Sequence, residues 1–246
     1  TGYPELPPIR SGYATADYMS AYAGVFAVMT ALYWRDLGGG SGQVIDLALY
    51  APTLRASEAS IPLYHRAGHV RERGGDRNPY IVPSSSFATA DGRWVVLSAN
   101  TEVLWRRLAA VIGSPELARD ERFATLAARC EHADELYAIL EDWTRSRSAA
   151  EIVRVCDEGG VPAAAVNSIA EVFADPHVRA REDIVVVDDE RVGPVAVAGV
   201  VPKLSATPGR IDHLGEALGG STEEVLGRLL GLRADEIAGL RERGVI

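Results

Sequence analysis

One carboxylate, that of Asp17, stands where local structure would favour its charged form. It precedes a run of apolar side chains at helical spacing, so it would lie in the first turn of a helix. Unpaired backbone N–H groups and the helix dipole stabilise negative charge there, and the carboxylate would stay ionised at neutral pH. An ionised carboxylate is able to act as a base or a nucleophile. Taken alone, however, an Asp at a helix start is more often a capping or first-turn residue without a chemical role.

A second segment of chemical interest is basic and surrounds the glycine pair Gly74-Gly75. Its cationic or protonatable side chains are Arg66, His69, Arg71, Arg73 and Arg77. Such a cluster could bind anionic groups, and a solvated basic loop is an equally good interpretation. A Gly-Gly pair in a charged linker is also more often a plain turn.

Composition narrows the class of protein. The 246 residues are 47% hydrophobic and carry a net charge of -9, so the chain can bury a core and has no general attraction for nucleic acid or an anionic membrane. No apolar run reaches the length of a membrane span. Only Cys130 and Cys156 are present and no leader is seen, which predicts a reduced, cytoplasmic protein. The five histidines lack metal-ligand spacing, so we expect no metal site.

The element that must position Asp17 is a helix over residues 16–37, ended by the glycine run 38–40. Residues 43–49 predict a short strand. Residues 51–66 have helical spacing interrupted by two prolines, and residues 66–83 read as a linker or loop.

The middle of the chain predicts a compact α+β unit built on a hairpin. Alternating runs at 85–89 and 94–98 flank Asp91-Gly92, a strong hairpin signal. Helices are expected at 103–112, after Ser114-Pro115, at 132–146 and at 149–158, followed by a strand at 161–166. Further strands are expected at 184–188 and 194–200, and two helices close the chain. Capping boxes are predicted at Ser148-x-x-Glu151 and Ser221-x-x-Glu224.

The sequence resembles the family III acyl-CoA transferases (the CaiB/BaiF family), which include formyl-CoA and carnitine CoA-transferases. The matching residues run in order along almost the whole chain: Ala16-Asp17-Tyr18, Gly24, Ala31-Leu32, Arg35, 40–46, Phe87, 91–97, Trp105, Leu108, Asp120, Phe123, Arg129, 160–163, Asp175-Pro176, Arg181, Leu232, Glu236-Ile237, Leu240 and Val245-Ile246.

The resemblance implies an α/β fold, with the remainder of a Rossmann-like large domain and a small α+β domain. Residues 1–66 would belong to the large domain, 67–79 to a linker, 80–183 to the small domain, 184–200 to linker strands, and 201–246 would return to the large domain. In the family, chains form interlocked dimers. Because the chain starts within a turn-rich loop and without Met, we expect a homodimer or a complex with a chain that carries an N-terminal half.

The resemblance also assigns roles. The Asp matching Asp17 attacks an acyl-CoA thioester and becomes an aspartyl-CoA thioester, which an acceptor carboxylic acid resolves. Gly74 and Gly75 stand where some relatives have a glycine loop that closes over this Asp, so they are candidates for oxyanion donors. Leu49 and Tyr50 resemble positions near the pantetheine of CoA, although ordinary packing is as good an interpretation, and Arg71 and Arg73 could meet its phosphates. CoA is thus a substrate, and no tightly bound cofactor is implied.

Two alternatives stay open. An α-methylacyl-CoA racemase would keep Asp17 and move a proton at the α-carbon. Against it, an aromatic and glycine run is expected after that Asp, whereas Tyr18-Met19-Ser20-Ala21 follows, and the racemases' further active-site Glu would fall at Asn100-Thr101, with Glu102 displaced by one. The other alternative is a non-catalytic subunit that completes a partner's fold.

Overall fold

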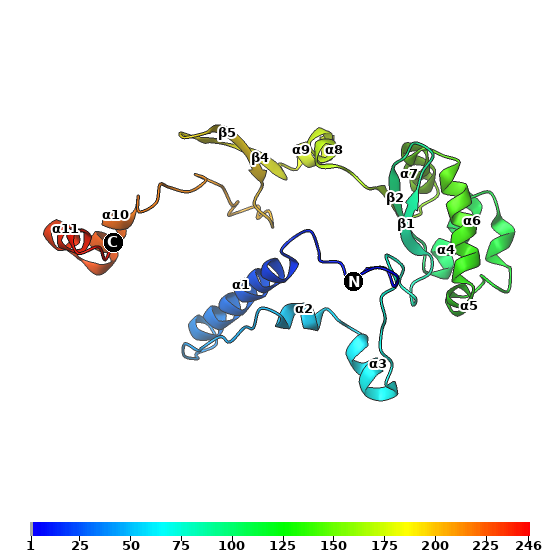
Figure 1. Cartoon of the computed structure of the whole chain (residues 1–246), viewed down its shortest axis with the longest axis horizontal. Coiled ribbons are helices and arrows are strands. Elements are labelled where there is room, and N and C mark those ends of the chain that lie inside the picture. Colours follow the sequence, from blue (N-terminus) through cyan, green and yellow to red (C-terminus); the bar gives the residue numbers. More distant parts are fainter. Residues whose placement is uncertain (1) are drawn as a thin grey trace. The chain divides into compact units, whose positions relative to one another are not determined.

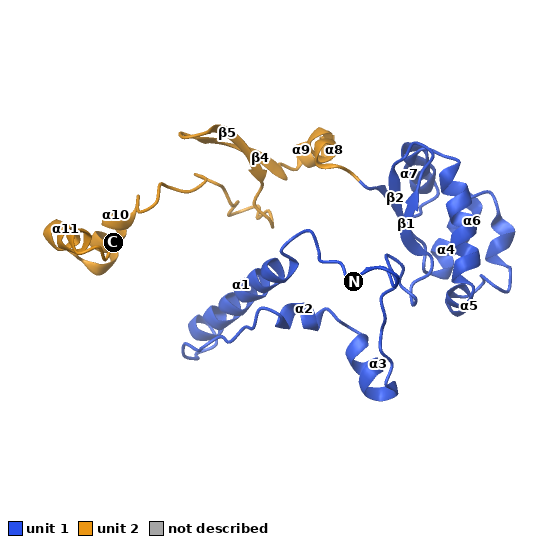
Figure 2. Ribbon diagram, viewed as in Figure 1, with its two compact units in different colours: residues 1–166 blue, residues 167–246 orange. Residues whose placement is uncertain are grey.

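The structure is a computed structural model that describes residues 2–246. It divides into two compact units, residues 1–166 and 167–246 (Figure 1, Figure 2). Each unit is described by itself, so the predicted packing of residues 201–246 against residues 1–66 stays a prediction, as do the predicted domain boundaries.

The first unit begins with the long helix predicted around Asp17. Helix α1 (Thr15–Asp36) confirms that prediction within one residue at each end. It stops where the glycine run folds back over the ring of Trp34. A Cβ at Gly38 would lie 2.7 Å from that ring, so a larger residue could not follow this path. Only Ser20 of the helix is buried, and large apolar side chains such as Phe26 (74% exposed) and Tyr33 (67% exposed) face solvent.

Two short helices follow, α2 (Ala51–Arg55) and α3 (Ser60–Ala67), as the interrupted helical spacing predicted. Helix α2 contacts α1, and the Ser20 hydroxyl donates a hydrogen bond of 2.8 Å to the carbonyl of Leu49. The strand predicted over residues 43–49 is wrong, because this segment is irregular. A strand needs a hydrogen-bonded neighbour, and none pairs with the segment among residues 2–246.

The rest of the first unit is a three-stranded antiparallel sheet with helices. The strands β1 (Ser84–Ala88), β2 (Trp94–Ser98) and β3 (Ala163–Ala165) lie in the order β1-β2-β3. The predicted hairpin is confirmed, with Phe87 opposite Val95. Gly92 has a φ of +73°, a left-handed conformation that glycine adopts without strain. The carboxylate of Asp91 accepts hydrogen bonds from the Thr89 hydroxyl and from the backbone N–H of Ala149, and so ties the turn to the next helix.

Four α-helices and one 3₁₀ helix complete this part: α4 (Glu102–Val111), η1 (Pro115–Ala118), α5 (Leu126–Glu131), α6 (Ala133–Arg145) and α7 (Ala149–Glu158). Every second side chain of β1 and β2 is buried, and α6 and α7 contact these strands. The buried hydrophobic residues come from the sheet, from connecting segments and from α4, α6 and α7, and include Phe87, Leu97, Trp105, Leu136 and Ile152. Ser148 caps α7 by accepting from the Glu151 N–H, which confirms one half of the predicted capping box. The Glu151 carboxylate does not bond the Ser148 N–H in the described chain and lies 3.7 Å from Arg147 instead.

One charged side chain, that of Arg129, is fully buried in this core. Its guanidinium donates three hydrogen bonds to backbone carbonyls, those of Val82 (2.9 Å), Phe123 (3.1 Å) and Asn100 (2.8 Å). Burial lowers the pKa of the guanidinium, and the nearby Glu102 carboxylate opposes that effect. Arg129 therefore joins the start of the sheet region to two loops that flank α4.

The second unit holds a hairpin between helices. Its elements are α8 (Ile169–Ala174), α9 (Pro176–Ala180), β4 (Ile184–Asp189), β5 (Gly193–Ala198), α10 (Thr222–Leu230) and α11 (Ala234–Glu242). The two strands predicted here are confirmed, and the structure shows that they pair with each other, with Val185 opposite Val197. The predicted cap by Ser221 is wrong, because its hydroxyl bonds the carboxylate of Glu216 instead of a helix N–H. Among residues 2–246, no helix is long and apolar enough to cross a membrane.

Candidate functional site

Asp17 lies in the first turn of α1, and its side chain is exposed. Within residues 2–246 its carboxylate makes no ion pair or side-chain hydrogen bond. Asp17 and Ser20 are three residues apart, so their side chains lie on the same face of the helix. Ser20 holds the carbonyl of Leu49, and Thr53 approaches Met19 with 4.0 Å between its hydroxyl and the sulfur. The structure thereby brings the segment that contains Leu49 and Tyr50 to the Asp17 end of α1.

The side chains of Leu49 and Tyr50 are exposed, by 56% and 68%. Within residues 2–246 they are not packed in a core, and both interpretations of these positions, core packing and contact with CoA, stay predictions. An exposed apolar and an exposed phenolic side chain close to Asp17 are available to contact a substrate or another part of a larger assembly.

The other predicted residues meet at a separate pocket. A pocket of about 840 Å³ is lined by the segment that carries Arg71, Arg73, Gly74 and Gly75 on one side and by the start of α6 on the other. His69 and Tyr80 also line it, and their side chains hydrogen bond each other at 3.0 Å. Neither Asp17 nor Leu49 nor Tyr50 lines this pocket. The site residues thus form two groups, one at α1 and one at the glycine pair.

The glycine pair is fastened to the beginning of the chain. Arg73 donates to the carbonyls of Tyr3 (3.3 Å) and Pro4 (3.1 Å), and the N–H of Gly75 donates to the carbonyl of Gly2 (3.1 Å). These acceptors are neutral, so they leave the positive charge of Arg73 uncompensated. The Gly75 N–H is occupied. The Gly74 N–H has no hydrogen bond with any part of the chain that the structure describes, which makes it the donor available to a ligand.

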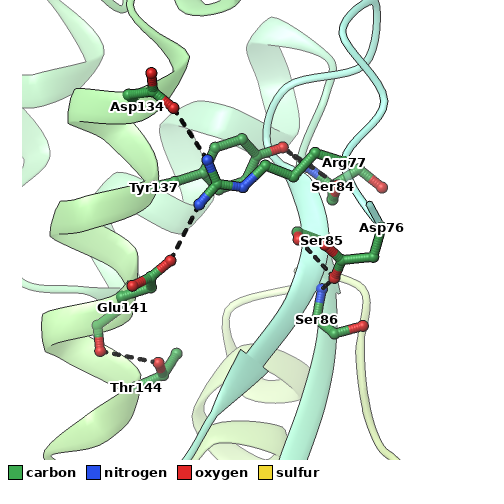
Figure 3. A network of polar contacts seen from close by, with 9 residues as sticks. All are labelled: Asp76, Arg77, Ser84, Ser85, Ser86, Asp134, Tyr137, Glu141 and Thr144. Atoms are coloured by element: carbon green, nitrogen blue, oxygen red, sulfur yellow. Dashed lines mark hydrogen bonds and ion pairs between the residues drawn. The ribbon is translucent and has the colours of Figure 1, made fainter. Parts of the chain in front are cut away.

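Immediately after the glycine pair, Asp76 and Arg77 bind the α+β part of the unit (Figure 3). The Asp76 carboxylate accepts hydrogen bonds from the Ser85 hydroxyl (2.9 Å) and the Ser86 N–H (2.8 Å). Burial raises the pKa of Asp76, but these hydrogen bonds outweigh it and hold the pKa below its usual value of 3.8. The carboxylate is therefore ionised at neutral pH.

Arg71 differs from Arg73 and Arg77. Among residues 2–246 its guanidinium has no ion pair and no hydrogen bond, whereas Arg77 pairs with two carboxylates. The pocket consequently presents the charges of Arg71 and Arg73 to an incoming anion, while the charge of Arg77 is used within the protein.

The two glycines differ in what they tolerate, which gives a first test. Gly75 has a φ of +67°, and a Cβ there would lie 2.6 Å from the ring of Tyr3. At Gly74 an added Cβ would meet only the carbonyl of Arg77, at an ordinary 3.4 Å. We expect Gly75→Ala to displace the segment from residues 2–4 and to raise amide hydrogen exchange over residues 72–78 at least threefold. Gly74→Ala is the matched control and should leave exchange nearly unchanged. Equal exchange in the two variants would contradict this account.

The described residues give no indication of a cysteine nucleophile or of a metal site. Burial raises the pKa of the Cys156 thiol to about 11, and it also raises that of Cys130, which lines the pocket. Neither thiol is a ready nucleophile. Within residues 2–246, no group of three His, Cys, Asp or Glu side chains could hold a metal ion.

Glu102, the acid nearest the position expected in a racemase, has a structural contact. Its carboxylate accepts a hydrogen bond of 3.2 Å from the N–H of Leu126, at the start of α5. The backbone hydrogen bonds from Glu102 itself and from Leu126 lower its pKa. Glu102 therefore helps to hold α5 in place.

Asp76 has no sequence signal of a structural role, and the position of Arg77 in a basic segment predicted only a possible anion ligand. Their partners lie 9 to 64 residues away in sequence, so no local pattern pointed to them. The weak signal was Tyr137 between the acidic residues Asp134 and Glu141 at helical spacing.

Comparison with known proteins decides the family. The model of CoA-transferase family III matches residues 1–221. The chain belongs to this family. Two relatives from Chloroflexus aurantiacus are a succinyl-CoA–D-citramalate CoA-transferase, 42% identical over 246 residues, and the beta subunit of a succinyl-CoA–L-malate CoA-transferase, 41% identical over 248 residues. Each comparison covers all of this chain and 61% of the relative, so the chain spans about three-fifths of the length of these proteins.

Solved structures agree with the predicted α/β fold. A CaiB/BaiF family protein from Brucella suis superimposes with a TM-score of 0.71 at 29% identity, covering 93% of this chain and 59% of that protein. Rv3272 from Mycobacterium tuberculosis superimposes with a TM-score of 0.72 at 23% identity, covering 87% and 56%, and supports the fold alone. The predicted family and the reading of the chain as part of that fold are confirmed.

Proposed function

We propose that the protein containing this family III chain transfers CoA from an acyl-CoA thioester to a carboxylic acid, with Asp17 as the covalent nucleophile. The observation that carries the proposal is the exposed Asp17 carboxylate in the first turn of α1, without an internal partner in the described residues. Relatives that are 42% and 41% identical are named for succinyl-CoA and the dicarboxylates D-citramalate and L-malate. We therefore propose a succinyl-type donor and a dicarboxylic acceptor.

The chemistry balances without a cofactor. The Asp17 carboxylate attacks the thioester carbonyl and expels the CoA thiolate, leaving a mixed anhydride. The thiolate attacks the aspartyl carbonyl and releases the donor acid, which gives an aspartyl-CoA thioester. The acceptor carboxylate repeats these two steps in reverse, so Asp17 is regenerated. A carboxylate suits this exchange because each anhydride has about the reactivity of the others, and no step is thermodynamically steep.

Each addition creates an oxyanion that backbone N–H donors would stabilise. Gly74 is the proposed donor, since its N–H is available whereas that of Gly75 is bonded to Gly2. This role requires the acyl group on Asp17 to be brought to the Gly74-Gly75 segment, and the resemblance to relatives in which a glycine loop closes over this Asp suggests that the two meet.

We propose that the parts of the substrate away from the reacting carbonyl are bound at both sites, the pocket at the glycine pair and the Asp17 end of α1. Arg71 and Arg73 would meet anionic groups, either the phosphates of CoA or the second carboxylate of a dicarboxylic acid, because their charges are not neutralised by carboxylates. Leu49 and Tyr50 would contact the pantetheine, which is consistent with their exposure beside the Asp17 end of α1.

A further polypeptide region is part of the proposal. The apolar side chains of α1 are exposed in the described chain, including Val25, Phe26, Tyr33 and Trp34. Exposed apolar patches of this kind mark surfaces that other protein covers. We propose that the N-terminal half expected from the resemblance covers them, within an interlocked homodimer or in a complex of two kinds of chain. The cytoplasmic location stays a prediction.

Mass spectrometry tests the proposal. The complete enzyme, incubated with succinyl-CoA and no acceptor, is expected to gain the mass of CoA on the peptide that contains Asp17, and an added dicarboxylic acid should discharge it. A racemase would instead exchange the α-proton of a branched acyl-CoA with deuterium from solvent and never carry the adduct. A non-catalytic subunit would show neither reaction, and either result would overturn the proposed function.

A further inference from the structure

The residues that follow the glycine pair form a two-point anchor. The guanidinium of Arg77 donates to Asp134 (3.0 Å) and Glu141 (3.1 Å) and lies over the ring of Tyr137, 4.3 Å from its centre. Asp134 and Glu141 are seven residues apart on α6, so they lie two turns apart on one face, with Tyr137 between them. Figure 3 shows the guanidinium lying across the aromatic ring between the two carboxylates.

The second anchoring point is on the sheet. Asp76 binds Ser85 and Ser86 of β1, and the hydroxyl of Tyr137 hydrogen bonds both the N–H and the carbonyl of Ser84 at 3.2 Å. Tyr137 is almost completely buried. One connected network of hydrogen bonds and ion pairs therefore joins the segment Asp76-Arg77 to helix α6 and strand β1, with the buried ring of Tyr137 at its centre.

The glycine pair consequently has contacts on both sides. On one side, Arg73 and Gly75 bind residues 2–4. On the other side, Asp76 and Arg77 bind the α+β core. Three residues of chain span at most about 10 Å, so Gly74, two residues before Asp76, stays within that distance of β1 and α6 while Asp76 and Arg77 hold.

We propose that Asp76 and Arg77 are positioning residues, whose attachment to β1 and α6 fixes the backbone of Gly74-Gly75 in the geometry needed for acyl transfer. This inference rests on the proposed function. The contacts themselves suit positioning better than global stability, because the Arg77 and Glu141 side chains are each 40% exposed and the Asp134 side chain is 99% exposed. Exposed ion pairs contribute little to the free energy of unfolding, but they restrict the segment that they hold.

Trypsin provides a direct readout, since it cuts after Arg71 and Arg73, next to the glycine pair. In the full chain, Arg77→Met keeps an unbranched side chain but loses both ion pairs. We expect cleavage after Arg71 and Arg73 to become about fivefold faster, while the melting temperature changes by no more than in the control. Asp76→Ala, which acts through β1 instead of α6, should change cleavage in the same direction. Arg77→Lys, able to keep one ion pair, should fall between wild type and Arg77→Met.

Arg147→Met is the matched control. Arg147 also lies over an aromatic ring, that of Trp143 at 5.1 Å, and also faces a carboxylate, that of Glu151 at 3.7 Å. Its side chain has no hydrogen bond or ion pair with residues 69–80 in the described chain, and it is outside the pocket. Cleavage after Arg71 and Arg73 should be the same in this variant as in the wild type.

The link to catalysis is tested in the complete enzyme. Arg77→Met should lower kcat for CoA transfer about tenfold and change KM for the acyl-CoA less than twofold, while Arg147→Met changes neither. Unchanged cleavage, or faster cleavage with an unchanged kcat, would overturn the positioning role. A wild type that never forms the Asp17 adduct would overturn the proposed function instead, whatever the cleavage rates are.

Discussion

Replacing Asp17 with Asn is expected to abolish CoA transfer in the complete enzyme while leaving the fold almost unchanged. The amide is close in size to the carboxylate, but it cannot attack a thioester to form an anhydride, so the rate should fall by at least about 10³-fold. The change in stability should stay within about 1 kcal/mol, the usual contribution of one negative charge in the first turn of a helix. Steady-state transfer between succinyl-CoA and a dicarboxylic acid, together with thermal unfolding, measures both quantities.

Asp36→Asn is the control for this substitution, because Asp36 lies at the other end of α1 and is also exposed. It removes the same charge from the same helix and should retain activity. If Asp17→Asn also retained activity, Asp17 would be only a first-turn residue. If the wild type exchanged an α-proton without any CoA adduct, the racemase interpretation would replace the transferase.

Local patterns were sufficient where the structure is determined by neighbours in sequence. Helix α1 follows from apolar residues at helical spacing and from the glycine run that folds over Trp34. The β1–β2 hairpin follows from Asp91-Gly92, since Gly92 adopts a left-handed conformation. In both cases the decisive interaction joins residues within a few positions of each other.

Predictions failed where a partner outside the local pattern decides. Residues 43–49 have the apolar composition of a strand, but no strand of the described residues offers them a hydrogen-bonding edge. Ser221 precedes Glu224 at capping spacing, yet its hydroxyl donates to the carboxylate of Glu216 and accepts from no N–H of α10. Composition shows that a segment could form a strand or a cap, but the available partner determines whether it does.

The candidate site shows the same division. Asp17 was identified by its helix-start position and by family resemblance, and the structure adds that its carboxylate is exposed beside the Leu49 segment. The anchoring role of Arg77 could not be predicted, because Asp134 and Glu141 are 57 and 64 residues away. The basic residues of this loop thus differ in the structure. Arg77 is paired with carboxylates, whereas the charges of Arg71 and Arg73 are available to an anionic ligand.

The largest effect on stability is expected at Arg129. Arg129→Met keeps most of the apolar volume but removes the donors of three hydrogen bonds, leaving the carbonyls of Val82, Phe123 and Asn100 without them. Each buried carbonyl left without a donor costs about 1–3 kcal/mol. Part of the total for three carbonyls is offset, because the variant no longer has to desolvate a buried guanidinium. We therefore expect the free energy of unfolding to fall by about 3–5 kcal/mol, a large share of the 5–15 kcal/mol typical of a domain. Arg129→Lys should lie between the two, because an ammonium group has a different reach and cannot reproduce the planar fork.

Urea unfolding followed by tryptophan fluorescence measures this loss, because Trp105 is buried with its ring centre 5.8 Å from the Arg129 guanidinium. The control is Arg154→Met, which removes only an exposed ion pair with Glu158 on α7 and should cost less than about 1 kcal/mol. A midpoint for Arg129→Met no lower than that of the control would mean that the carbonyls find other donors or water. In that case the guanidinium would not be what holds the β1 region to the loops around α4, and the Asp76–Arg77 anchor would stand on a core fixed by apolar packing alone.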